Sequence, residues 1–246
     1  MKGGIFCTLI LKLALIYAVL AGKEPCGLTT QCLESITVSR ELRKEGFHRE
    51  LVTSVQCVSG FPDTLHTLLI EQMPREIYMD PYQLASEEQE TGLQVLLDSD
   101  IDLEAPAYVS SGFSALVYPL QGLSCSRCFQ ATVPIHCRYQ RPSGSGDRGE
   151  LIHIQSPKLL LRAPSCQLPL DFPPQIVTDA PCSALNHSMC SWLEIHYKQD
   201  PGSLTLEIPV GDKQLAESVC AGTLLVTLLC CGLIGGAVWK HLPSLS

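Results

Sequence analysis

The Cys-x-x-Cys motif at 125–128 has the residue types and the spacing of a thiol redox site. Such a site lowers the pKa of its first thiol by placing that thiol at the N-terminus of a helix. Here Cys125 and Cys128 lead directly into residues 129–139, where apolar and polar residues alternate as in a strand. We therefore expect these two cysteines to form structural disulfides, as most cysteines of secreted proteins do. A luminal thiol oxidoreductase is the alternative.

A zinc site could in principle use the side chains of Cys125, Cys128, His136 and Cys137, since zinc binds thiolates and imidazoles. His136 and Cys137 are adjacent on the expected strand. Consecutive strand residues point to opposite faces, which makes shared coordination of one ion awkward. We predict no metal site.

The acidic segment at 98–102 contains two overlapping Asp-x-Asp pairs, made by Asp98, Asp100 and Asp102. Some glycosyltransferases use such a pair to hold a divalent metal with a donor phosphate, because hard oxygen ligands suit Mg²⁺ or Mn²⁺. A nucleotide-sugar enzyme would place it after an α/β nucleotide-binding unit, and a lipid-linked donor would require several membrane spans. The sequence has neither pattern, so we interpret the segment as a solvated acidic turn. The whole sequence also lacks a nucleophile elbow, a zinc-protease motif and a phosphate-binding glycine loop. We therefore predict no catalytic residue and no cofactor.

Asn186 is the single asparagine of the chain and starts the sequon Asn186-His187-Ser188. The sequon lies in a polar stretch between Cys182 and Cys190, which is typical of a surface loop. We predict that Asn186 carries an N-linked glycan.

Both ends of the chain are hydrophobic. Residues 1–21 combine Lys2, an apolar run and a small-residue end at Ala21, which predicts a cleaved signal peptide; an uncleaved anchor is the alternative. Residues 218–239 contain no charge and are long enough to span a hydrocarbon core of about 30 Å. A GPI-attachment tail is less consistent with the Lys240 and His241 that follow, so we expect a transmembrane helix and a short cytosolic tail at 240–246.

The remaining segment, residues 22–217, holds all 25 acidic residues and nine of the 13 cysteines. The formal net charge of the whole chain is −8, which excludes the chain-wide basic surface typical of nucleic-acid binders. Nine cysteines in an oxidising compartment should mostly pair, and their odd number leaves at least one free or bonded to another chain.

We expect residues 22–217 to form one all-β unit. All but one of the 17 prolines lie there, too closely spaced for long helices. Two segments, 129–139 and 204–210, alternate apolar and polar residues with the period of a half-buried strand. Pro134 cannot donate to a neighbouring strand, so 129–139 should be an edge strand or carry a bulge. Weaker strands are expected at 51–58, 67–71, 93–97, 115–118 and 151–154. Together they indicate an antiparallel β-sandwich-like, disulfide-containing domain.

The membrane segment has a possible packing face. Gly232 and Gly236 are four residues apart, so they share one face of a helix. Glycines there let another helix approach closely. Glycine is also simply common in membrane helices, which is the alternative interpretation.

Several motifs together resemble the phosphatidylinositol-glycan biosynthesis class X family, which shares a domain with the yeast protein Pbn1. The resemblance covers roughly 35–240. The motifs are GFHR at 46–49, MDPYQLA at 79–85, IDLEAP at 101–106, CFQA at 128–131, VPIHCRYQRP at 133–142 and IPVG at 208–211.

The resemblance is less specific around Cys26, Cys32 and Cys57. The disulfide candidates are therefore the other six cysteines of the segment: Cys125, Cys128, Cys137, Cys166, Cys182 and Cys190.

The resemblance implies a membrane protein of the endoplasmic reticulum with most of its chain in the lumen. It implies a non-catalytic subunit that stabilises GPI mannosyltransferase I, whose catalytic partner is the multi-span class M protein. That enzyme transfers the first mannose from dolichol-phosphate-mannose to the glucosaminyl-acyl-phosphatidylinositol intermediate. From the residues alone, a cell-surface adhesion or receptor ectodomain remains the alternative, although the short tail leaves little room for signalling.

Overall fold

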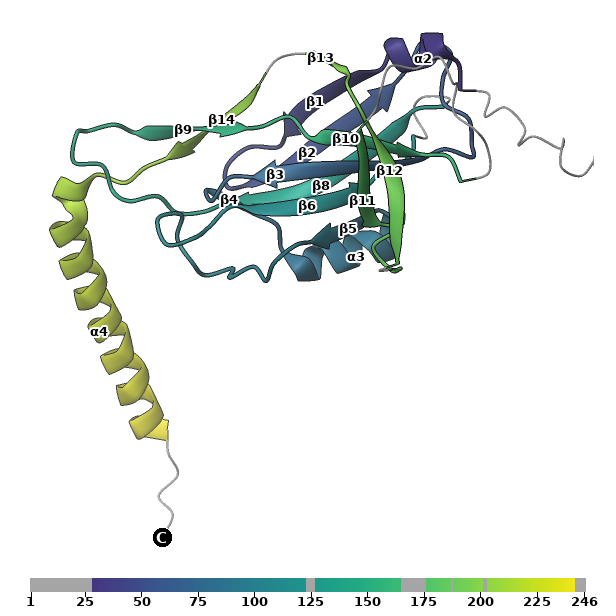
Figure 1. Cartoon of the computed structure of the whole chain (residues 1–246). Coiled ribbons are helices and arrows are strands. Elements are labelled where there is room, and N and C mark those ends of the chain that lie inside the picture. The colour runs from purple at the N-terminus through teal and green to yellow at the C-terminus, as the bar shows by residue number, and fades with distance from the viewer. Residues whose placement is uncertain (1–27, 123–126, 165–175, 187, 201–202, 242–246) are drawn as a thin grey trace, which may run out of the picture.

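The computed structural model describes residues 28–122, 127–164, 176–186, 188–200 and 203–241 (Figure 1). The predicted signal peptide at 1–21 lies outside the described residues. Two six-stranded sheets, a separate two-stranded sheet and a long C-terminal helix make up most of this part of the chain.

The first sheet has the strand order β13-β1-β2-β8-β4, with β7 also paired to β8. Its strands are β1 (Thr37–Arg43), β2 (His48–Gln56), β4 (Ile77–Tyr78), β7 (Leu120–Gln121), β8 (Phe129–Cys137) and β13 (Lys198–Asp200). All its pairings are antiparallel except that of β1 with β13.

The second sheet has the order β11-β12-β10-β3-β6-β5 and is antiparallel throughout. Its strands are β3 (His66–Met73), β5 (Gln94–Leu97), β6 (Phe113–Tyr118), β10 (Lys158–Arg162), β11 (Ile176–Pro181) and β12 (Met189–Ile195). A further antiparallel pair, β9 (Gly149–Ile154) and β14 (Leu204–Pro209), leads toward the C-terminal helix (Figure 1).

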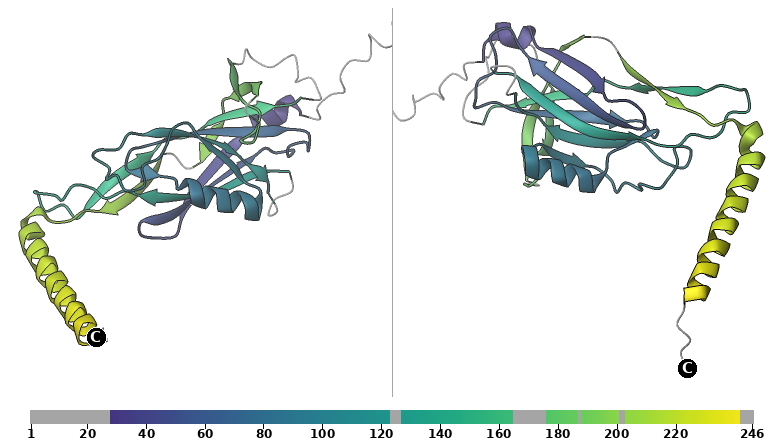
Figure 2. Two further views of the ribbon diagram at one scale, coloured as in Figure 1. Left: turned by 90° about the horizontal axis from the view of Figure 1, so that it is seen from below. Right: turned by 180° about the vertical axis from the view of Figure 1, so that it is seen from behind.

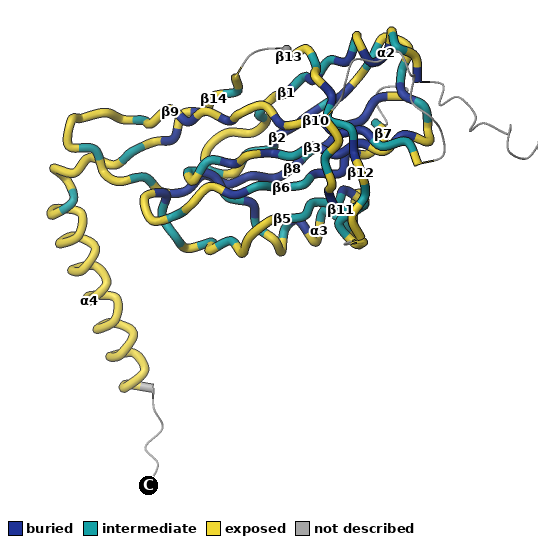
Figure 3. The backbone as a smooth tube through the Cα atoms, in the orientation of Figure 1, coloured by how far each residue is buried: buried dark blue, intermediate teal, exposed yellow. Residues whose placement is uncertain are grey.

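The main core lies between the two large sheets. Val38 and Leu51 from the first sheet and Leu69, Val117 and Leu159 from the second belong to one buried cluster. A smaller cluster around Trp192 includes Leu68, Tyr118 and Leu160. These residues alternate along their strands with those of the main core, so they lie on the other face of the second sheet. In Figure 3 the buried residues follow these strands. The predicted antiparallel β-sandwich-like fold is confirmed.

Strand β8 has the predicted alternation. Phe129, Ala131, Val133 and Ile135 are all buried in the main core.

Pairing with β2 and with β4 and β7 makes β8 an interior strand, not the expected edge strand. On the second side, however, β7 pairs only with residues 129–130 and β4 only with residues 136–137. The backbone N–H of Arg138 points to that side, toward Glu76 O, and by alternation so does the nitrogen of Pro134. Pro134 thus faces the gap between β7 and β4, where no ladder bond is lost.

Helix α3 (Pro81–Thr91) was not predicted. Asp80 caps its N-terminus by accepting from the Tyr82 N–H, and Pro81 stands in the first turn, where its missing N–H costs nothing. Gly92 ends the helix with a left-handed φ of 82°. The density of prolines excludes long helices but not a short helix that begins with one. A single turn of helix, α2 (Thr30–Glu34), precedes β1.

Helix α4 (Ala216–His241) follows a 3-10 turn at Lys213–Leu215 and extends away from the β domain (Figures 1 and 2). A stretch of 18 residues within 213–240 has a mean hydropathy of 2.1, and the helix is long and apolar enough to cross a membrane. From Glu217 to Lys240 its side chains are exposed, as Figure 3 shows.

The cysteines match the expectation in part. Cys182 is bonded to Cys190, and Cys32 to Cys57, a pair outside the six candidates. Cys128 is also disulfide-bonded. Cys125 and Cys166 lie outside the described residues.

Cys137 corrects one prediction, because it carries a free thiol. Its side chain belongs to the apolar core of the sandwich, which explains why a cysteine can remain unpaired there.

Candidate functional site

Four of the motifs that are far apart in the sequence meet at the C-terminal end of β8. They are the segments at 46–49, 79–85, 101–106 and 133–142. Strand β2 contributes the first, the start of α3 the second, the connection from β5 to β6 the third and β8 the fourth. The contacts below join them into one cluster.

His136 is the centre of this cluster and is only 9% exposed. Its ring stacks on Tyr78 at 4.9 Å and meets His48 edge-on at 4.7 Å. Burial, followed by the nearby His48, lowers the pKa of His136, so its ring is neutral near pH 7. Nε2 lies 2.7 Å from Oε1 of Gln83, which can only accept, so the neutral ring donates this hydrogen bond.

Arg138 joins the third motif to the fourth. Its Nη1 donates to the carbonyl oxygens of Asp102 and Ala105, each at 2.6 Å, and its guanidinium lies over the Tyr78 ring at 4.8 Å. The chain after β8 continues the contact, since Ala107 N donates to Tyr139 O and the Tyr139 ring packs against Phe47. These contacts hold the segment at 101–107 against the end of the first sheet.

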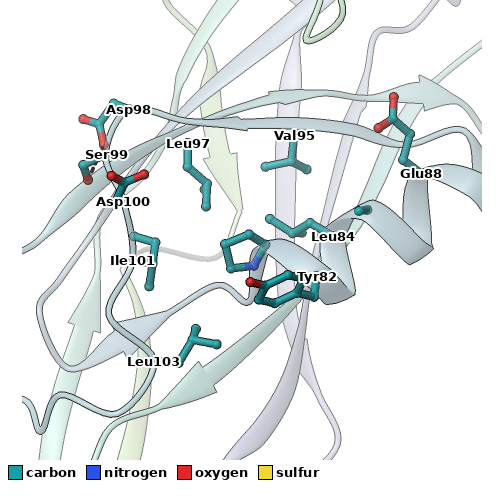
Figure 4. A pocket seen from close by; sticks show the side chains of 12 residues that line it. Tyr82, Leu84, Glu88, Val95, Leu97, Asp98, Ser99, Asp100, Ile101 and Leu103 are labelled. Carbon is teal, nitrogen blue, oxygen red and sulfur yellow. Dashed lines mark hydrogen bonds between the residues drawn. The ribbon is translucent and has the colours of Figure 1, made fainter.

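A groove of about 740 Å³ opens beside this cluster, between α3 and residues 95–103 (Figure 4). Its walls include Leu84, Val95, Leu97, Ile101 and Leu103. Tyr82, from the second motif, is 81% exposed at its edge.

The contacts of His136 do not resemble a catalytic triad. Its partners are the His48 and Tyr78 rings and the Gln83 amide, with no serine, cysteine or carboxylate among them. Burial raises the pKa of the Cys137 thiol, which keeps it protonated and unreactive. Among the described residues, no three His, Cys, Asp or Glu side chains are grouped to hold a metal ion.

The three aspartates of the acidic segment lie where the sequence suggests. Asp98, Asp100 and Asp102 are all exposed. Asp98 accepts from Ser99, and Asp102 accepts from the N–H of Glu104, as in an ordinary turn. Asp98 and Asp100 reach the rim of the groove, which the sequence alone did not indicate.

The other predicted site residues lie away from this cluster. Asn186 is exposed in the loop between β11 and β12, which the Cys182–Cys190 disulfide closes. Gly232 and Gly236 lie on α4, and the space where a side chain would begin is open at both.

Comparison with known proteins identifies the family. The sequence model of the PIG-X / PBN1 family matches residues 44–239. This chain belongs to that family. It is 36% identical over 233 residues to the human protein named "GPI alpha-1,4-mannosyltransferase I, stabilizing subunit", covering 91% of this chain and 87% of that protein. Mouse and rat proteins of the same name are also 36% identical, over 229 and 223 residues. These names do not support the cell-surface alternative.

The four motifs of this PIG-X / PBN1 member are visible in the sequence, but nothing in the sequence shows that they meet in space. Tyr78, which contacts both His136 and Arg138, lies just outside the motif at 79–85, and no local pattern singles it out. The groove could not be predicted either, because α3 forms one of its walls and that helix was not predicted.

Proposed function

We propose that this chain is the stabilising, non-catalytic subunit of GPI alpha-1,4-mannosyltransferase I. The observation that carries this is the 36% identity, over 91% of the chain, to a human protein of that name. The enzyme transfers the first mannose to the glycosylphosphatidylinositol precursor, and its catalytic subunit is the multi-span class M protein. A β domain without a catalytic triad in its described cluster, carried on one apolar helix, supports an accessory role.

The proposal places the β domain in the lumen of the endoplasmic reticulum. A signal peptide at 1–21 is removed, α4 spans the membrane, and Asn186 is glycosylated. An acidic segment rich in disulfides suits an oxidising lumen.

Stabilisation follows from mass action. A subunit that binds only the folded enzyme lowers its free energy by about 2.7 kcal/mol when present at a hundred times its dissociation constant. A change of that size alters the abundance of a marginally stable protein several-fold under cellular quality control.

Association is tested by capturing the tagged full chain from membranes in mild detergent. The class M subunit should be recovered with it, and an unrelated single-span glycoprotein of the endoplasmic reticulum is the control. Recovery of no mannosyltransferase subunit would contradict the proposal.

The non-catalytic role is tested by replacing Asp98, Asp100 and Asp102 together with Asn. Mannose transfer, measured in membranes and divided by the amount of catalytic subunit that co-purifies with this chain, should stay unchanged, because these carboxylates perform no chemistry. Loss of transfer at an unchanged amount of co-purified catalytic subunit would make this chain part of the active site.

A further inference from the structure

The groove beside α3 has a mixed lining, in which several apolar side chains are left partly uncovered between polar and acidic ones. Leu97, Val95 and Ile101 are only half-buried, and Tyr82 is largely exposed. Figure 4 shows their side chains converging on one space, with the Leu103 side chain at its lower edge. Covering these side chains would remove apolar surface from water, which favours an occupant with aliphatic side chains.

The charged side chains that line the groove are all acidic. Glu88 stands at one end, and Asp98 and Asp100 stand at the other (Figure 4). Residues 81–104 contain seven carboxylates and no Lys, Arg or His. An occupant that matches this pattern carries basic residues on either side of its aliphatic ones, since complementary charges steer and orient association. Anionic lipid headgroups or a second acidic copy of this chain would be repelled.

We propose that this groove binds a luminal segment of the catalytic subunit, with aliphatic side chains between the walls and Lys or Arg at both ends. This inference rests on the proposed function and assigns it a surface. Figures 1 and 2 show α3 and β5 on the side of the β domain toward which α4 extends. A multi-span enzyme packed beside α4 would present its luminal loops to that side.

Filling the groove tests the proposal. Ala85 is exposed on α3 and lines the groove, whereas its neighbour Ser86 is exposed and does not. Full-length Ala85→Trp should lose most co-purification of the class M subunit from membranes in mild detergent. Ser86→Trp, which adds the same side chain to the same helix, should retain it. Equal recovery with both variants would overturn the proposal.

Reversing one charge gives a second test that leaves the apolar walls intact. Asp100→Lys should lower recovery of the class M subunit several-fold at low salt. Glu90→Lys, an equal charge change on α3 outside the groove lining, should not. The difference between the two variants should shrink at high salt, because screening weakens exposed charges. If Ala85→Trp melts at a lower temperature than Ser86→Trp, this pair of charge variants decides the question.

The outcomes separate the groove from the function. If the unaltered chain recovers the class M subunit and all four variants do so equally, the groove proposal fails and the proposed function stands. If the unaltered chain recovers none, the proposed function fails first. Groove-dependent pairing of two differently tagged copies, or groove-dependent binding of the chain to phosphatidylserine vesicles, would also overturn the proposal.

Discussion

Arg40 and Glu71 form an ion pair inside the sandwich that links its two sheets. Arg40 belongs to β1 and Glu71 to β3, and their side chains meet at 2.7 Å with each only 2% exposed. Arg40 also donates to the carbonyl of Gln155 at 2.6 Å. Burial raises the pKa of Glu71 to about 7, and the charge of Arg40 partly opposes that rise.

Replacing Arg40 with Met should destabilise the protein by about 3–5 kcal/mol, because it leaves a buried carboxylate without its partner. The pKa of Glu71 should then rise further. A folded state that binds this proton more tightly than the unfolded state loses stability as pH rises. The destabilisation caused by Arg40→Met should therefore be larger at about pH 8 than at about pH 5.5. Thermal unfolding of the full chain in detergent at the two pH values measures the destabilisation and its pH dependence.

The exposed pair Arg43–Glu41 supplies the control for this prediction. Both side chains are more than half exposed, so Arg43→Met should change stability little at either pH. An equal effect of the two substitutions would contradict a special role for the buried pair.

The cysteines give a second prediction at the residue scale. Cys57→Ala should cost about 3–4 kcal/mol, because it opens a disulfide that joins residues 25 apart. Cys137→Ala should cost on the order of 1 kcal/mol, since it removes only a buried sulfur and leaves no cysteine unpaired. Protein abundance and thermal unfolding, measured for Cys57→Ala and for Cys137→Ala, compare the two costs. A peptide map that finds Cys137 in a disulfide would contradict the assignment.

Local patterns explain which single residues could be predicted. The sequon and the spacing of Cys182 and Cys190 are local, so Asn186 could be placed in a surface loop. The Arg40–Glu71 pair and the contacts of His136 join residues that are 31 and 53 or more positions apart. Only the register of the sheets brings such residues together, and no short motif encodes it.

At the scale of elements, α4 carries a prediction for its glycine face. The double substitution Gly232→Leu and Gly236→Leu should weaken co-purification of the catalytic subunit, because leucines hold neighbouring helices apart. Insertion into the membrane should stay normal. Thr227→Leu, on the opposite face of the same helix, is the control. Full recovery of the complex with the double variant would assign binding to the β domain alone.

The loop between β11 and β12 carries the glycan prediction. Asn186→Gln should remove the entire endoglycosidase H-sensitive mass shift, since no other asparagine exists in the chain. Ser188→Ala should do the same, whereas Ser188→Thr preserves the sequon and should keep the shift. A shift that persists in Asn186→Gln, or is absent from the unaltered protein, would contradict the prediction.

The elements differ in how well the sequence predicts them. Burial alternates along β14 and along the first four residues of β8, so these strands are visible as alternating patterns in the sequence. No strand was predicted at β1, β4, β7, β10, β11, β12 or β13. In β10 the three central residues are all buried, because apolar clusters cover both faces of the second sheet, and alternation disappears.

For the whole molecule, two surfaces are available for the proposed association: the exposed apolar length of α4 and the acidic-rimmed groove beside α3. Fold class and the C-terminal span follow from composition and periodicity. The groove does not, because it exists only once α3 and the acidic turn pack against the sandwich.

The half-life of the class M catalytic subunit, in cells from which this chain has been deleted, tests the central claim most directly. Pulse-chase labelling should show faster loss of the subunit without this chain, and recovery when the chain is restored. Surface GPI-anchored proteins should fall and recover with it. An unchanged half-life of the catalytic subunit in the deleted cells would contradict a stabilising role.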